Sequence, residues 1–196
     1  MVSAFADTIK FDHWRRYESR VERNTFKILD LLDEYGVKAT FFVLGWIAEK
    51  YPGIVREIKK RGHELASHSY RHSLAYELTA EEFRKDTRIS KELIEDISGE
   101  RVAGYRAPSY SITKDSLWAI DILAEEGFVY DSSIFPIHHD RYGIPELSRF
   151  TSRIGKNGAG DILEIPLSTV RLFGKNIPIA GGGYLRLLPL KFIEWG

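Results

Sequence analysis

The sequence predicts an α/β fold in which helices pack against a parallel sheet. Amphipathic segments alternate with short apolar segments between residues 24 and 134, and each amphipathic segment ends at a glycine. Parallel strands must be joined by crossovers, so this alternation favours a parallel sheet. An open doubly wound sheet and a closed or nearly closed barrel fit the pattern equally, and both place chemistry at the carboxyl ends of the strands.

The expected helices and strands follow one another in pairs. Three helix starts are marked by Pro52, by the capping-box spacing of Thr79 and Glu82, and by Thr113 as an N-cap. After residue 135 the alternation weakens, and residues 136–160 are expected to form a long loop on the substrate side. The helices are expected over residues 24–36, 52–62, 79–99 and 113–127, and the strands over 37–45, 63–67, 101–105, 128–134 and 162–169.

Composition narrows the functional classes. The chain has 196 residues, which favours one domain over residues 1–196, and its 28 basic and 28 acidic residues cancel, so no nucleic-acid partner is expected. There is no cysteine, which excludes disulfides, thiolate metal sites and cysteine nucleophiles. No apolar run reaches the ~18 residues of a membrane span, and the first residues lack the order of a secretory signal. We therefore expect no membrane span and a cytoplasmic location.

The stretch "SHSYRH" contains the first candidate site. His68 and His72 stand four positions apart, directly after an expected strand, so both imidazoles could bind one divalent ion such as zinc. With six histidines in the chain such a spacing also arises by chance, and a pair of partly exposed surface histidines is the alternative. The second histidine cluster, His138 and His139 beside Asp140, could supplement a metal site or could be a solvated or substrate-contacting part of the long loop.

Two further candidates lie at strand exits. Arg106 in "GYRAPSYS" could orient a carboxylate, or could be a structural arginine paired with an acid on a loop. Pro108 stiffens the turn, so the backbone amide of Ser109 points in a fixed direction and could serve as an oxyanion donor. Asp131 in "YDSSI" could be catalytic or could cap its own turn.

Together, "VKATFFVLGW", "GHELASHSYRH", "GYRAPSYSIT", "GFVYDSSIFP" and "AGGGYLRLLP" resemble the polysaccharide deacetylases of the NodB-homology group, carbohydrate esterase family 4, and within it the branch found beside bacterial exopolysaccharide loci linked to exosortase sorting. The resemblance implies a distorted (β/α) barrel of about seven strands and a divalent metal, usually zinc, that activates water to remove an N-acetyl group from a sugar. His68 and His72 match the metal-binding motif, Arg106 and Pro108 the next motif, and Asp131 the acid of the following one. Ser109 stands where many members have tyrosine, whose backbone amide the family uses.

Two motifs of the resembled family have no counterpart here. A strand ending in paired acids, which supplies a metal-binding aspartate and the general base, should precede "VSAFADT", and a strand carrying the histidine general acid should follow "LRLLPLKFIEWG". Asp7 and Asp12 do not close an apolar strand, so these roles are not transferred to them. We therefore expect a domain truncated at both ends, with weak metal binding and little activity of its own.

Three functions remain open. The first is metal-dependent deacetylation of an N-acetylated bacterial polysaccharide. The second keeps the fold and the metal but acts on another amide substrate. The third is a non-catalytic protein that binds carbohydrate.

Overall fold

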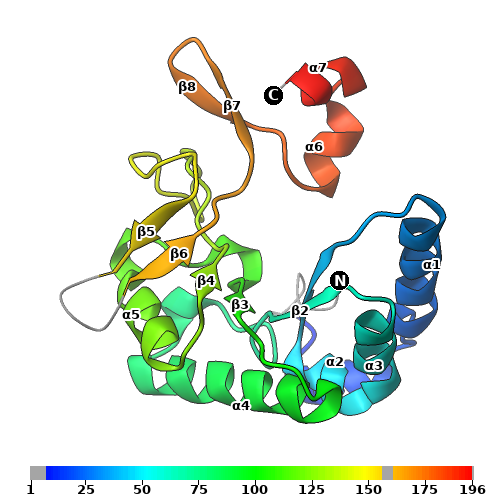
Figure 1. The fold of residues 1–196 in the computed structure, drawn as a ribbon. Coiled ribbons are helices and arrows are strands. Elements are labelled where there is room, and N and C mark those ends of the chain that lie inside the picture. Colours follow the sequence, from blue (N-terminus) through cyan, green and yellow to red (C-terminus); the bar gives the residue numbers. More distant parts are fainter. Residues whose placement is uncertain (1–7, 156–160, 196) are drawn as a thin grey trace. The chain divides into compact units, whose positions relative to one another are not determined.

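The computed structural model describes residues 8–155 and 161–195, which divide into two compact units (Figure 1). The first unit comprises the described residues up to His72 together with Asp86–Val102. The second comprises Ser73–Lys85 and the described residues from Ala103 onward. The helix α4 (Ala80–Ser98) contributes to both units. The prediction of one domain over residues 1–196 stays a prediction.

The first unit pairs two parallel strands and packs helices around them. Its remaining elements are the 3₁₀ helix η2 (Phe11–Arg16), α1 (Val21–Glu34), β1 (Thr40–Val43), α2 (Gly45–Lys50), α3 (Pro52–Lys60) and β2 (Glu64–Ser67). Strand β1 pairs in parallel with β2. The helix α1 buries Leu29, and α3 buries Ile54, Val55 and Ile58, because apolar residues recur at helical spacing along each.

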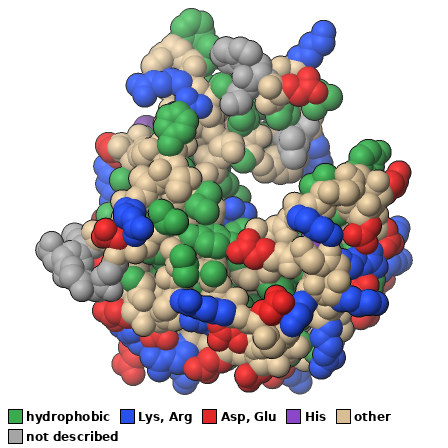
Figure 2. Space-filling model, in the orientation of Figure 1, with side chains coloured by type: hydrophobic (Ala, Val, Ile, Leu, Met, Phe, Trp, Pro, Cys, Tyr) green, Lys and Arg blue, Asp and Glu red, His purple; other side chains and the backbone are tan. Residues whose placement is uncertain are grey.

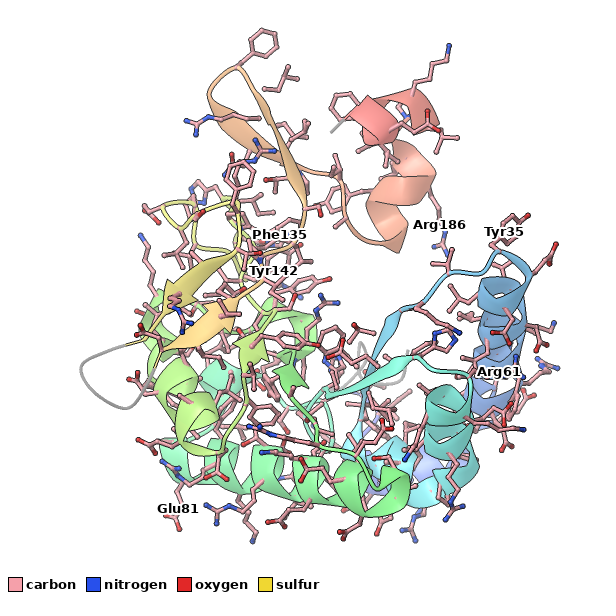
Figure 3. The ribbon with its side chains drawn as sticks, in the orientation of Figure 1. Tyr35, Arg61, Glu81, Phe135, Tyr142 and Arg186 are labelled. Atoms are coloured by element: carbon pink, nitrogen blue, oxygen red, sulfur yellow. The ribbon has the colours of Figure 1, made fainter. Side chains whose placement is uncertain are left out.

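Glycines end the helices of the first unit where the sequence predicts. Gly36 and Gly62 adopt the left-handed φ values of 63° and 73°, a conformation that costs glycine little and reverses the chain after α1 and α3. Arg61, which directly precedes Gly62, joins the two helices. Its guanidinium contacts Asp30 at 2.7 Å and Asp33 at 2.9 Å (Figure 3).

The second unit contains three parallel strands and one antiparallel edge. Strand β3 (Gly104–Tyr105) pairs with β4 (Tyr130–Asp131), which pairs with β6 (Ile162–Glu164); β5 (Ser152–Ile154) runs antiparallel to β6. The other elements are the 3₁₀ helices η3 (Ala75–Glu77), η4 (Pro108–Tyr110) and η5 (Lys114–Ser116), the helices α5 (Trp118–Glu125), α6 (Gly182–Leu187) and α7 (Leu190–Trp195), and the hairpin of β7 (Thr169–Leu172) and β8 (Lys175–Pro178).

An aromatic core supports these strands. Tyr105 of β3 is fully buried between Phe83, whose ring centroid lies 5.8 Å away, and Phe128 at 5.5 Å. Both contacts are edge-to-face, the arrangement that aromatic quadrupoles favour. The core therefore fixes the end of β3, the strand that leads into the predicted site residue Arg106.

The predicted fold class is confirmed as a mixed α/β arrangement of parallel strands and helices. The strand pairings recorded within each unit, for the residues that the structure describes, do not close a barrel. Figure 2 shows Lys and Arg side chains interspersed with Asp and Glu over the visible surface, in keeping with the balanced composition. In the described ranges, no helix is both long enough and apolar enough to cross a bilayer.

Candidate functional site

His68 and His72 lie on a loop that directly follows β2. Their ring centroids are 5.1 Å apart and the ring planes stand at 80°. Both side chains are half-buried. Two imidazoles at this separation and partial exposure can turn their nitrogens towards a common ion that enters from solvent.

The backbone of this loop is strained at two positions. Ser69 and His72 have left-handed φ values of 66° and 63°, which side chains other than glycine rarely adopt. A hydrogen bond of 2.9 Å from the backbone N–H of His72 to Oγ of Ser69 closes the turn between them. Such strain persists only where the surroundings over-determine the conformation, and it concentrates at functional sites.

Hydrogen bonds to the rest of the first unit hold the loop in place. The carbonyl oxygen of Ser69 accepts from the backbone N–H of Gly45 at 2.9 Å and from Oγ of Ser90 at 3.0 Å. The hydroxyl of Ser67 donates to Oγ of Ser90 at 3.0 Å, and the backbone N–H of Tyr70 donates to Oδ2 of Asp86 at 2.8 Å. The helix α4 therefore positions the residues on either side of His68 and the middle of the turn that leads to His72.

These two histidines fit part of a metal site. Burial lowers the pKa of His72 and favours the neutral imidazole, the form that binds a metal. Among the residues that the structure describes, no group of three or more His, Asp or Glu side chains is placed to hold an ion. Asp12 therefore supplies no third ligand in the described part of the chain, and Asp7 lies outside it. The pair accounts for two of the three protein ligands that a catalytic zinc usually has.

Arg106 lies directly after β3, in the second unit. Its Nε donates to the carbonyl oxygen of Ser132 at 2.9 Å and its Nη2 donates to the hydroxyl of Ser132 at 2.6 Å. Burial lowers the pKa of Arg106, while the neighbouring Tyr110 and Asp131 raise it. The guanidinium therefore braces the exit of β4, and its predicted role in orienting a carboxylate stays a prediction.

Ser109 occupies an exposed turn in η4. Its φ of 51° and ψ of 26° lie in the left-handed region, and Tyr110 follows with a φ of 56°. Within the described residues, the backbone N–H of Ser109 donates no hydrogen bond. The exposed turn after Pro108 therefore contains one backbone donor that no described residue engages, as an oxyanion donor requires.

Asp131 is fully buried, beside an acid that the sequence analysis did not select. Asp131 accepts from the hydroxyl of Ser133 at 2.5 Å and from its backbone N–H at 3.2 Å. Its register partner on β6 is Glu164, which is 3% exposed and whose Oε1 accepts from the backbone N–H of Ile134 at 3.0 Å. Oε2 of Glu164 is buried without a hydrogen-bond partner among the described residues, and the pKa of both carboxyls is raised, which favours one proton shared by the pair.

The physical cause of this sharing is desolvation. Two carboxylates cannot both be ionised in a low-dielectric interior, and burial, followed by the charge of Asp131, raises the pKa of Glu164 well above its usual range. Burial also raises the pKa of Asp131, while hydrogen bonds from Glu164 and Ser133 oppose that shift. We conclude that Glu164 holds the proton at neutral pH and Asp131 accepts from it.

The predicted site residues are therefore distributed over both units. His68 and His72 belong to the first, and Arg106, Ser109 and Asp131 belong to the second. His68 and Arg106 each directly follow a strand, and Asp131 ends one, as the sequence predicts. Glu164 ends its strand as well, and that shared position in "ILEIPLST" was the only signal that could have selected it.

Comparison with known protein families shows to which family the chain belongs. A family model described as polysaccharide deacetylase matches residues 8–127. The chain belongs to the polysaccharide deacetylase family. His68, His72, Arg106 and Ser109 all fall in the matched part. A second model, described as a domain of unknown function (DUF3473), matches residues 132–196.

Three known proteins are similar to part of the chain. A peptidoglycan-N-acetylglucosamine deacetylase of Bacillus cereus is 37% identical over 98 residues, which are 50% of this chain and 36% of that protein. The crystal structure of a protein named as a polysaccharide deacetylase from Mycobacterium smegmatis is 31% identical, with a TM-score of 0.63, and the match covers 84% of this chain and 52% of that one. A CE4 family pseudoenzyme from Bacillus anthracis is 25% identical, with a TM-score of 0.50 over 53% of this chain and 36% of that one. The chain thus spans about a third to a half of the length of these relatives.

Proposed function

We propose that this protein hydrolyses N-acetyl groups of a bacterial polysaccharide with the help of a divalent metal that His68 and His72 hold. Zinc is the metal that we favour. The arrangement that carries the proposal is the imidazole pair, 5.1 Å apart on a strained loop that α4 and α2 hold by hydrogen bonds. Membership of the polysaccharide deacetylase family supports it, since the pair lies inside the matched region.

Each residue has a role that its surroundings allow. When bound, the metal would supply Lewis acidity and an acidified water for attack on the acetamide. For the backbone N–H of Ser109, which donates no hydrogen bond within the described residues, the family resemblance implies the role of oxyanion donor. Asp131 is fully buried and cannot touch a saccharide, so its role is to position Ser133, to which it is hydrogen-bonded. Arg106 positions Ser132 in the same way.

The substrate is proposed more narrowly from the sequence motifs. The B. cereus relative is named for the N-acetylglucosamine of peptidoglycan. The five motifs quoted above together resemble the branch linked to exopolysaccharide loci, which favours an N-acetylated exopolysaccharide for this chain. Amine release from N-acetylglucosamine oligomers tests the reaction that both substrates share.

A zinc titration tests the site directly. We expect the chain to retain sub-stoichiometric zinc after dialysis, because two imidazoles compensate the ion's charge incompletely. His68→Ala should abolish this retention, whereas His13→Ala, which removes an exposed imidazole from η2, should leave it unchanged. Equal zinc retention in the wild type and His68→Ala would contradict the assignment.

The deacetylation assay decides whether the site is catalytic. With zinc added to saturation, slow amine release is expected, and loss of the metal and its bound water should reduce it at least ~100-fold in His68→Ala. Amine release that persists in His68→Ala would place the catalytic site elsewhere.

A non-catalytic carbohydrate-binding protein is the second candidate. The likeness to a CE4 family pseudoenzyme and the absence of a third ligand among the described residues favour it. Zinc retention and saccharide binding without amine release, at saturating zinc and with several N-acetylated sugars, would select this candidate.

A further inference from the structure

A pocket of about 550 Å³ lies in the second unit, inside the segment that matches the family of unknown function. The loop after β4 forms one side, from Pro136 to Pro145, and the β7–β8 hairpin forms the other, from Arg171 to Pro178. This volume is within the range of pockets that hold small organic ligands, which also includes one or two sugar rings.

The lining of this pocket is cationic. His138, His139, Arg171 and Lys175 line it, and no Asp or Glu is among its lining residues. Neither Arg171 nor Lys175 forms an ion pair with any residue in the described ranges. Asp140 stands beside the pocket, and its Oδ1 contacts Nδ1 of His139 at 2.8 Å. Arg171 is thus available to an anionic ligand.

An aromatic stack gives the pocket a firm wall. The ring of His139 lies flat on the ring of Tyr142, with centroids 3.8 Å apart and planes at 8°. Tyr142, which Figure 3 labels close to Phe135, lies parallel to that ring, with centroids 6.2 Å apart and planes at 7°. Phe135 is buried in a cluster with Ile137 and Leu167. The imidazole face of His139 is therefore held on packed rings and does not depend on a free loop.

The opposite wall is tied to the same loop. Nδ2 of Asn176 donates to the carbonyl oxygen of Pro136 at 2.7 Å, which joins the hairpin to the loop after β4. Arg171 is the register partner of Asn176, so both side chains stand on the same face of the hairpin. Arg171 therefore stands on the face of the hairpin that Asn176 joins to the loop after β4.

We propose that this pocket binds an acidic sugar residue, one that carries a carboxylate, within the polysaccharide on which the protein acts. Arg171 would hold the carboxylate through paired N–H donors, and the His139 and Tyr184 rings would contact the apolar face of the sugar. The proposal rests on the proposed function, because it names the class of that same substrate. It follows that the polymer alternates or combines N-acetylated and acidic sugars.

Calorimetric titration without added zinc tests the proposal independently of turnover. The probes are a hyaluronan tetrasaccharide, which carries N-acetyl groups and carboxylates, a neutral chitin tetrasaccharide, and inorganic phosphate. We expect the acidic tetrasaccharide to bind at least ~10-fold more tightly than the neutral one, and its affinity to fall as salt increases.

A matched pair of variants locates the binding. Arg171→Gln should weaken the acidic tetrasaccharide at least ~5-fold, and Arg153→Gln, which removes an exposed arginine of β5 that does not line the pocket, should leave it unchanged. Equal thermal unfolding temperatures of the two variants will show that any difference arises in the pocket.

Three results would overturn the proposal. The first is no binding of the acidic tetrasaccharide, the second is equal binding of the neutral one, and the third is phosphate binding that is as tight as saccharide binding. The amine-release assay with zinc is run separately. Binding of the acidic tetrasaccharide without amine release in any condition would contradict the deacetylase function and support the acidic-sugar pocket. Amine release without binding of the acidic tetrasaccharide would support the deacetylase function and contradict the pocket.

Discussion

Asp131 and Glu164 stand opposite each other on the parallel strands β4 and β6, both buried in the interior of the second unit, and burial raises the pKa of each carboxyl. The pair receives hydrogen bonds from Ser133 and from the backbone of Ile134. These partners continue the chain directly after β4, so the carboxyl pair shapes the segment that leads from the strand into the loop of the cationic pocket.

Replacing Glu164 should change how stability depends on pH. Because burial raises the pKa of Glu164 in the folded state, that state keeps a proton which the unfolded chain releases near the ordinary glutamate pKa of 4.5. The free energy of unfolding should therefore be largest below that value and fall as pH rises. Glu164→Gln keeps a neutral donor of similar shape and should flatten this fall. Urea unfolding at about pH 5, 7 and 9 measures the slope.

The control for this prediction is an exposed acid. Glu81→Gln removes a carboxylate from the surface of α4, which Figure 3 labels, and should leave the slope as it is in the wild type. An equal slope in Glu164→Gln and the wild type would show that no proton is held between the two strands.

Gly45 should tolerate no side chain, because it lies against the loop that carries the histidines. A Cβ at this position would stand 2.6 Å from Cδ2 of Tyr70 and 3.1 Å from Cα of Ser90. Gly45→Ala should lower the free energy of unfolding by about 1–3 kcal/mol and weaken zinc retention, since both neighbours position the His68 loop. Denaturant unfolding and the zinc titration measure the two effects.

Gly53→Ala is the matched substitution, because the nearest atom to a Cβ there is 4.0 Å away. It should leave zinc retention unchanged and should not destabilise α3. Unfolding curves that coincide for the two alanine variants would rule out the close packing of Gly45.

Arg106 should not be replaceable by lysine. The planar guanidinium reaches the carbonyl oxygen and the hydroxyl of Ser132 together, and a single ammonium group cannot reproduce both hydrogen bonds. Arg106→Lys should lower the free energy of unfolding by about 1–2 kcal/mol. Chemical denaturation tests this prediction, and Arg153→Lys, at the exposed position of β5, serves as its control.

An unchanged stability in Arg106→Lys would mean that the exit of β4 does not depend on the arginine. Ser132→Ala provides a second measurement, since it removes the hydroxyl that accepts the 2.6 Å bond from Arg106 and donates to the carbonyl oxygen of Ile165 at 2.7 Å. Combined in one double-mutant cycle, the two substitutions should cost less than the sum of their separate effects.

Local interactions explain why the helix boundaries could be predicted from the sequence. Thr79 and Glu82 form the predicted capping box, with the backbone N–H of Thr79 donating to Oε2 at 2.9 Å and the backbone N–H of Glu82 donating to Oγ1 at 3.2 Å. Thr113 caps the next helical segment together with Ser116. Each of these interactions joins residues three positions apart, so that short spacing contains all the information that they need.

The sequence alone determined the order of helices and parallel strands and the family to which the chain belongs. It also placed His68, Arg106 and Asp131 at the exits of strands. Periodicity, caps and short motifs act over a few residues, so all of this can be found locally. Only the tertiary structure decided that the buried Asp131 stands opposite Glu164, 33 positions away, and that His139 and Arg171 line one pocket. These pairings depend on strand register and on packing between distant segments, which no local pattern in the sequence specifies.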